Sequence, residues 1–226
     1  MPLDDTSGRT PGCRSASSPG AAPDPGAAIA IWSRIADTEA RDAVVATLGG
    51  LLEGNRRFAA GTPASRDLHR ERAALVSAQR PVAAVLACSD SRIAIEDTFD
   101  APLGTLFGIR TAGAALDSAV LGTLEFAVTN LGIRLIVALG HENCGAVRAA
   151  VAADTPPGAL GTVVGQIRGN IAGSPTFEAA IHANARATVR RMLEASAGLR
   201  SAFEGGRLAV VPAFYRLADG RVDLLG

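Results

Sequence analysis

The first third of the chain carries its apolar residues at helical spacing. After the helix-start signal at Asp37, apolar side chains recur every three or four positions. These are Val44, Val45, Leu48, Leu51, Leu52 and Phe58. A second helix is predicted over Asp67–Ala78, because the residue before Pro81 disfavours helical backbone. Together the two segments predict an N-terminal helical arm.

From residue 82 onward the pattern changes to short, continuous apolar runs. Val82–Ala87, Leu106–Ile109 and Leu135–Leu139 are each bounded by polar or turn-forming residues, which is typical of buried parallel strands. Between the last two runs, Ser118–Asn130 has the apolar spacing of a helix. This alternation of strand and helix predicts right-handed crossovers and a parallel sheet covered by helices.

The C-terminal part combines helices with a pair of strands. Thr162–Ile171 and Phe177–Ala195 have helical periodicity, while Leu208–Phe214 and Val222–Leu224 flank a glycine turn. The sequence has no internal repeat, and residues 35–226 contain no convincing linker. We therefore predict a single α/β domain over residues 29–226. It would have a mainly parallel central β-sheet flanked by helices, an N-terminal helical arm and a C-terminal strand pair.

Residues 1–28 differ from the rest in composition. They are rich in Pro, Gly, Ser and Ala and show neither helical nor strand periodicity. This predicts a flexible tail, in which Cys13 would be an idle thiol.

Charge and cysteine usage exclude several classes of function. The net charge is zero and all 22 basic residues are Arg, so no basic footprint for nucleic acid or an anionic membrane is present. Apolar stretches are shorter than a membrane span requires, and no secretory signal pattern is present. Three widely spaced cysteines are a poor disulfide framework and favour a reducing compartment. We expect a cytoplasmic protein.

Two polar motifs follow two of the predicted strands. Cys88-Ser89-Asp90-Ser91-Arg92 comes directly after Val82–Ala87, and His141-Glu142-Asn143-Cys144-Gly145 follows Leu135–Leu139. The carboxyl ends of parallel strands face one crevice, so the two motifs are expected at the same edge of the sheet.

Metal-capable side chains are the shared feature of the two motifs. His141 and Cys144 are three residues apart on a turn entering a helix, and Cys88 can add a third ligand. Two sulfurs and one imidazole suit Zn²⁺, and three protein ligands leave one tetrahedral position open, as in catalytic sites. Either motif alone has a simpler interpretation, because a cysteine after a strand is usually a small buried hydrophobe. Their joint occurrence favours zinc.

Asp90 and Arg92 extend this chemistry. In isolation they would be read as a loop-capping turn and a surface ion pair. Beside a metal, the Asp90 carboxylate can accept a hydrogen bond from bound water or occupy the open position, and Arg92 can hold it off the metal. A cysteine phosphatase loop is rejected, because only three residues separate Cys88 from Arg92 and none is glycine.

The combination of motifs resembles the β-class carbonic anhydrases. Cys-Ser-Asp-Ser-Arg is followed about fifty residues later by Gly-His-x-x-Cys-Gly. Further likenesses lie along residues 45–226: Leu51–Phe58, Leu106–Phe107, Arg110–Gly113, Gly122–Val128, Tyr215 and Asp219-Gly220.

The resemblance implies roles for individual residues. Cys88, His141 and Cys144 would ligate one Zn²⁺ per subunit, with Asp90 and Arg92 as a catalytic dyad and Asp90 as a fourth ligand only in a closed, inactive form. Three further positions match the family's substrate pocket, which is completed across a dimer interface: Gln79, Phe107 and Phe126. The expected partners are carbon dioxide or bicarbonate and a second copy of the chain, as a homodimer or a dimer of dimers.

Some positions depart from the family pattern. Phe126 stands where many members have Tyr, so the pocket should be more apolar, and Ala114 occupies a place often held by Asn. Val85 stands where members with a non-catalytic bicarbonate site carry Trp. Arg110 and Tyr215 match that site's other residues, but the missing Trp argues against such inhibition.

The implied reaction is reversible hydration of carbon dioxide to bicarbonate and a proton by hydroxide held on zinc. Two thiolates already neutralise the metal charge, so activity is expected to rise toward mildly alkaline pH. Two alternatives remain open at this point. One is a hydrolase of carbon disulfide or carbonyl sulfide on the same scaffold, and the other is a non-catalytic zinc-binding regulator.

Overall fold

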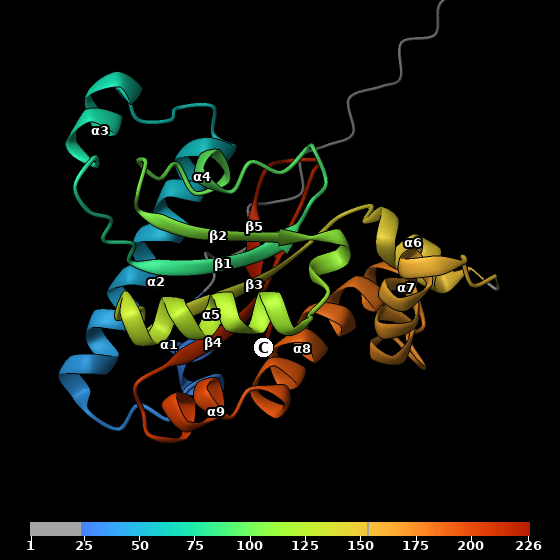
Figure 1. Cartoon of the computed structure of the whole chain (residues 1–226). Helices are drawn as coiled ribbons and strands as arrows, with labels where there is room; N and C mark the ends of the chain where they lie inside the picture. Colours follow the sequence, from blue (N-terminus) through green and yellow to red (C-terminus); the bar gives the residue numbers. More distant parts are fainter. Residues whose placement is uncertain (1–23, 153) are drawn as a thin grey trace, which may run out of the picture.

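The computed structural model describes residues 24–152 and 154–226, which form a central sheet between two layers of helices (Figure 1). The sheet has five strands in the order β2-β1-β3-β4-β5. The strands are β1 Ala83–Cys88, β2 Leu106–Thr111, β3 Leu135–His141, β4 Ala209–Tyr215 and β5 Val222–Leu224. β1 to β4 are parallel and β5 is antiparallel to β4, which confirms the predicted α/β class and the C-terminal strand pair.

Three parallel strands run further than the apolar runs that predicted them. Cys88 is the last residue of β1 and pairs with Thr111, while His141 is the last residue of β3 and pairs with Tyr215. The predicted boundaries at Ala87 and Leu139 were therefore too early. The reason is that ladder pairing depends on the backbone and continues where the side chains have already become polar. Both metal-capable residues thus lie on the sheet itself.

Helices cover both faces of the sheet because alternate strand residues point to opposite sides. One face packs Val85, Ala87 and Val137 against α2 (Thr38–Ala59) and α6 (Gly145–Val151). The opposite face packs Leu86 and Ile136 against α5 (Ser118–Asn130), the end of α8 (Phe177–Ala195) and α9 (Ala197–Glu204). The chain also contains two short elements, α4 Ile95–Thr98 and η1 Ala112–Ala114, and the longer helix α7 Gly158–Asn170.

The N-terminal arm differs in part from its prediction. α2 begins after Asp37, whose side chain accepts a hydrogen bond from the amide of Ala40, as expected of a helix cap. α3 covers only Leu68–Ala74 and has no buried residue, so nothing in the core extends it to Ala78. α1, Pro25–Ile31, begins inside the segment predicted as tail, so the boundary at residue 28 is too late. Residues 1–23, with Cys13, lie outside the described residues.

Asn55 ties α2 to the elements beside the carboxyl edge of the sheet. Its side-chain nitrogen donates to the carbonyls of Thr98 and Gly220 at 2.9 and 2.8 Å. Its side-chain oxygen accepts from the amide of Val222 at 2.8 Å. A buried amide with three partners is well satisfied, so the predicted arm is fixed to α4 and to the C-terminal hairpin.

Candidate metal centre

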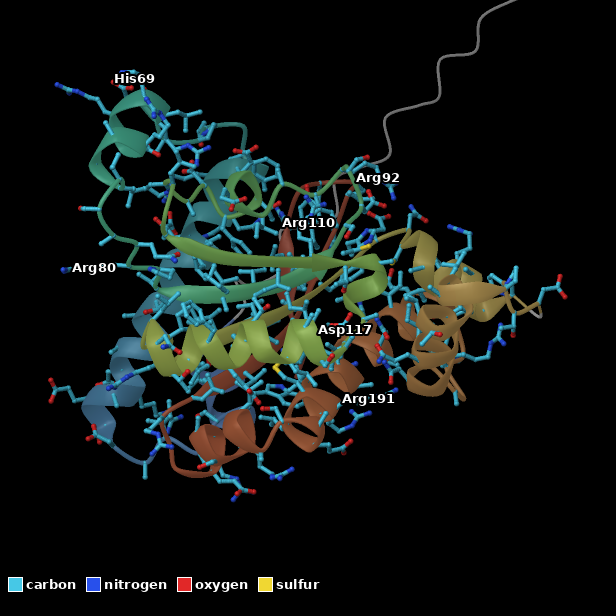
Figure 2. The ribbon with its side chains drawn as sticks, in the orientation of Figure 1. His69, Arg80, Arg92, Arg110, Asp117 and Arg191 are labelled. Carbon is cyan, nitrogen blue, oxygen red and sulfur yellow. The ribbon has the colours of Figure 1, made fainter. Side chains whose placement is uncertain are left out.

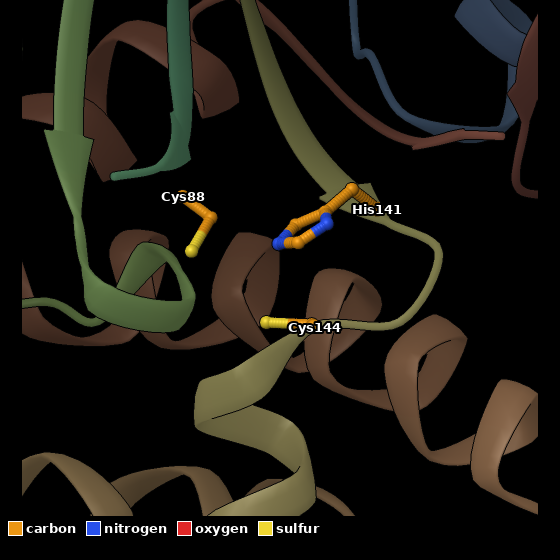
Figure 3. A group of neighbouring side chains, drawn as sticks. All are labelled: Cys88, His141 and Cys144. Carbon is orange, nitrogen blue, oxygen red and sulfur yellow. The ribbon is translucent and has the colours of Figure 1, made fainter. Parts of the chain in front are cut away.

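Cys88, His141 and Cys144 come together at the carboxyl edge of the sheet (Figure 3). Cys88 ends β1, His141 ends the neighbouring β3, and Cys144 is the residue that precedes α6. Their candidate ligand atoms all lie within 4.8 Å of one another, and all three side chains are buried. The parallel pairing of β1 with β3 therefore produces the convergence that the two motifs predicted.

The cluster fits a metal ion by its donor set and by an unpartnered buried atom. Nδ1 of His141 lies 2.9 Å from the carbonyl of Glu142, which favours the tautomer with a free lone pair on Nε2. That Nε2 is buried and has no hydrogen-bond partner within residues 24–152 and 154–226. A buried polar atom without a partner is costly, whereas coordination would satisfy it. Two thiols and an imidazole suit zinc.

The two cysteines are electrostatically coupled. Contact with Cys144 and the backbone N–H of Gly113 hold the pKa of Cys88 below its usual value, despite burial. The pKa of Cys144 is raised, because a thiolate there would face Cys88 and lie away from water. The two buried sulfurs therefore affect each other's ionisation, and a bound divalent cation would favour the thiolate form of both.

Asp90 and Arg92 form a close ion pair next to the cluster. Nε and one terminal nitrogen of Arg92 donate to the two carboxylate oxygens of Asp90 at 2.8 and 2.7 Å. Arg92 also donates to the carbonyl of Asn143 at 3.3 Å. These hydrogen bonds hold the pKa of Asp90 far below its usual value. The carboxylate stays ionised and lies 4.0 Å from Nε2 of His141.

Arg110 and Gly113 of β2 and η1 complete the surroundings of Cys88. The guanidinium of Arg110 donates to the carbonyls of Cys88 and Asp90, the first at 3.0 Å. The amide of Gly113 donates to Sγ of Cys88 at 3.3 Å. Arg110 thus holds the backbone of the first motif, from Cys88 to Asp90. Sequence reasoning placed Arg110 and Gly113 in a family-like segment but did not find these contacts.

Hydrogen bonds to the C-terminal hairpin hold the loop from His141 to Cys144 in place. The amide of Glu142 donates to the carbonyl of Tyr215 at 2.8 Å, and its carboxylate accepts from the amide of Ala218 at 2.9 Å. Asn143 has a left-handed backbone, with φ of 55°, which turns its carbonyl toward Arg92. Little in the sequence indicated the contact between the Glu142 carboxylate and the amide of Ala218, because a glutamate in a loop is usually solvated.

The residues matched to the substrate pocket lie elsewhere in the chain. Gln79 is exposed in the loop before β1, at the end opposite Cys88, and its neighbour Arg80 lies far from Arg92 in Figure 2. Phe107 lies near the start of β2 and packs on Phe126 of α5, with ring centroids 6.4 Å apart. Thr111, the last residue of β2, is four positions beyond Phe107, roughly 13 Å along the strand. One copy of the chain does not bring these residues to the cluster.

The fold and this cluster define an α/β protein with a candidate metal centre at the carboxyl edge of a parallel sheet. Residues 83–222 match the family model described as carbonic anhydrase. A carbonic anhydrase of Mycolicibacterium smegmatis is 41% identical over 191 residues, covering 80% of this chain and 92% of that protein. Carbonic anhydrase 2 of Mycobacterium tuberculosis is 40% identical over 193 residues, with the same coverage. The chain belongs to the carbonic anhydrase family, in its β class.

Solved structures agree with this assignment. A β-carbonic anhydrase of Coccomyxa in complex with acetazolamide superposes with a TM-score of 0.63 at 26% identity, covering 79% of this chain and 86% of that one. A tetrameric β-carbonic anhydrase of Sordaria macrospora shares the fold, with a TM-score of 0.62 at 24% identity, covering 69% and 85%. Among the described residues, no helix has the length and apolarity needed to cross a membrane.

Proposed function

We propose that this carbonic anhydrase hydrates carbon dioxide reversibly to bicarbonate and a proton, with Zn²⁺ held by Cys88, His141 and Cys144. The observation that carries the proposal is the convergence of two buried thiols and one imidazole, with Nε2 of His141 left unpartnered. Zinc, when bound, acidifies a coordinated water so that hydroxide is available near neutral pH. The three donors leave a fourth position for that chemistry.

The Asp90–Arg92 pair is the second part of the proposal. Arg92 occupies both carboxylate oxygens of Asp90, so the carboxylate is restrained beside the cluster. The restrained, ionised carboxylate can accept a hydrogen bond from the reacting water and orient its lone pair toward the substrate. This pairing favours a catalytic centre over the non-catalytic alternative, in which Asp90 would serve permanently as the fourth ligand.

The substrate-binding part of the proposal requires a second copy of the chain. Gln79, Phe107 and Phe126 are the residues proposed to hold carbon dioxide, and they lie away from the cluster of their own chain. Phe126 of α5 is 46% exposed, and its ring packs at a tilt on half-buried Phe107 of the edge strand β2. An exposed aromatic side chain backed by a second ring is suited to an interface between copies. We propose a homodimer or a dimer of dimers, in which Phe107 and Phe126 of one copy cover the metal centre of the other.

Stopped-flow carbon dioxide hydration, with zinc content measured on the same samples, tests the proposal. We expect about one zinc per chain and activity in the wild type, and loss of both in Cys88→Ser. Cys13→Ser is the matched control, because it makes the same change at the remaining cysteine, outside both motifs. Unchanged activity in Cys88→Ser, or equal loss in Cys13→Ser, would contradict the proposal.

Carbon disulfide and carbonyl sulfide are linear and apolar like carbon dioxide. A competition assay with each as alternative substrate separates the two activities. Preferential turnover of a sulfur compound would show that the same site acts as a hydrolase of that compound. The site needs the thiols of Cys88 and Cys144 in reduced form, which favours a reducing compartment such as the cytoplasm as the location of the protein.

A further inference from the structure

We propose that Asn184 of α8 is a positioning residue for the metal centre, acting on Cys88 through the backbone of Gly113. The proposal rests on the proposed role of Cys88 as a metal ligand. Within the described residues Asn184 has no hydrogen bond to the cluster or to the Asp90–Arg92 pair. Its contribution is to fix Gly113, the residue whose N–H donates to the Cys88 sulfur. No sequence motif pointed to this residue.

Two hydrogen bonds meet on Gly113. Nδ2 of Asn184 donates to the carbonyl of Gly113 at 2.9 Å, and the amide of Gly113 donates to Sγ of Cys88 at 3.3 Å. Both bonds are buried. The side chain of Asn184 therefore fixes the orientation of a residue whose N–H donates to the Cys88 sulfur.

Gly113 needs such a constraint because its backbone is unusual. It adopts a left-handed conformation with φ of 63° inside η1, which glycine reaches without steric cost. A Cβ at this position would lie 2.5 Å from Cδ1 of Ile167 and 3.0 Å from Cβ of Ala146. The close approach of the backbone thus requires glycine. Glycine is also the residue with the most conformational freedom, so an outside contact has to hold it in place.

The orientation of Asn184 is itself set from the outer side of α8. Nδ2 of Asn170 donates to Oδ1 of Asn184 at 2.9 Å, and the Arg191 guanidinium donates to Oδ1 of Asn170 at 3.1 Å. The amide of Asn184 is thereby forced to turn its donor toward Gly113. All donors run in one direction, from the Arg191 cation (labelled in Figure 2) toward the Cys88 thiolate. The hydrogen bonds from Arg191 to the Gly113 carbonyl pass through amide groups and polarise one another, and the Gly113 backbone links them to the bond on Cys88.

The competing interpretation is that Asn184 only satisfies buried polar groups and stabilises the packing of α7 on α8. The two roles differ in their effect on the metal. A hydrogen bond to a thiolate withdraws electron density from sulfur, so loss of a well-placed Gly113 N–H makes Cys88 a stronger donor to the ion. Outer contacts of this kind typically change metal affinity by 10- to 100-fold.

The experiment uses the full chain loaded with Co²⁺, whose sulfur-to-metal charge-transfer band reports the ligand sulfurs directly. In Asn184→Ala we expect the band to move to longer wavelength. The variant also loses the contact that orders Gly113 beside the ligand, and we expect this loss of order to outweigh the stronger donation by Cys88. Zinc affinity, measured by chelator competition, should therefore fall about tenfold. Thr188→Val is the matched control, since Thr188 is also buried on α8, one turn further along. The control should leave the band and the affinity unchanged.

An unshifted band and unchanged affinity in a folded Asn184→Ala protein would overturn the proposal, as would equal shifts in Thr188→Val. If Asn184→Ala does not fold, Asn170→Ala tests the same series of hydrogen bonds. Asn170 is half-buried and lies further from Cys88, so this variant should give a smaller shift in the same direction. No shift there would overturn the proposal as well. A wild type without a sulfur charge-transfer band would instead contradict the proposed metal centre itself, so the two failures are distinguishable.

Discussion

The carboxyl edge of the sheet and its outer β2 edge are built in opposite ways. At the carboxyl edge, Cys88, His141 and Cys144 are buried and meet within 4.8 Å in one chain. At the outer edge, Phe107 and Phe126 pair with each other while Phe126 remains 46% exposed. The chain by itself therefore assembles the part that can hold a metal, and leaves open the part proposed to hold the substrate.

Sheet topology explains the difference. β1 and β3 are interior neighbours, so their carboxyl ends are held side by side by ladder hydrogen bonds. β2 is an edge strand, and among the described residues no strand pairs with its outer side. Exposed edges of this kind are normally covered by another element or another chain. Substitutions in each region can therefore show whether the two regions are separable.

Cys144→Ser should have the largest effect, because it removes a ligand that no neighbour can replace. Metal affinity should fall by more than about 100-fold, beyond the losses typical of residues that only contact ligands. Activity should fall with it. Zinc analysis and stopped-flow hydration measure both, and circular dichroism checks that the fold survives. Full zinc content in this variant would remove Cys144 from the site.

Arg92→Ala should lower activity by about 100-fold and change its pH dependence. Arg92 holds the pKa of Asp90 low, so its loss raises that pKa and the carboxyl protonates at higher pH. In the wild type, activity should rise from pH 6 toward pH 9, since two thiolates weaken the acidity of a zinc-bound water. In the variant, the acid-side loss should begin at higher pH. Parallel pH profiles for the two proteins would contradict the proposed role.

Phe126→Glu should separate the two regions. A charge placed in a proposed aromatic interface should weaken self-association by roughly 30-fold or more, as at other interface hot spots. Activity should fall while each chain keeps its zinc. Light scattering gives the oligomeric state, and Leu160→Glu on α7 is the control, since Leu160 is also exposed but lies away from this edge. Loss of zinc in Phe126→Glu would show that the regions are coupled.

Glu142→Ala should have the smallest effect. It removes the carboxylate that accepts from the amide of Ala218 and leaves the three ligands in place. Loss of one such hydrogen bond should lower the free energy of unfolding by about 1 kcal/mol, measured by denaturant titration. Zinc content should not change. Loss of zinc would mean that the metal centre depends on the C-terminal hairpin more than its buried geometry suggests.

Local sequence patterns predicted an element well where the segment itself contains both the apolar period and the residue that caps the helix. Ser118–Asn130 and Phe177–Ala195 are helices with the predicted bounds, because each carries its own apolar period and cap. α3 was predicted too long, because no buried residue defines its end. The strand ends at Cys88 and His141 were missed, because pairing between neighbours extends the strands past the apolar run.

What the sequence by itself determined is the family, the α/β order of elements and the set of metal-capable side chains. These follow from residue types at short spacing and from the rule that parallel strands end at a common edge. Only the tertiary structure decided that Phe107 of β2 packs on Phe126 of α5. It alone decided that Asn184 reaches Gly113 from 71 positions away. Contacts between distant segments depend on how helices pack on the sheet, and local patterns do not encode that geometry.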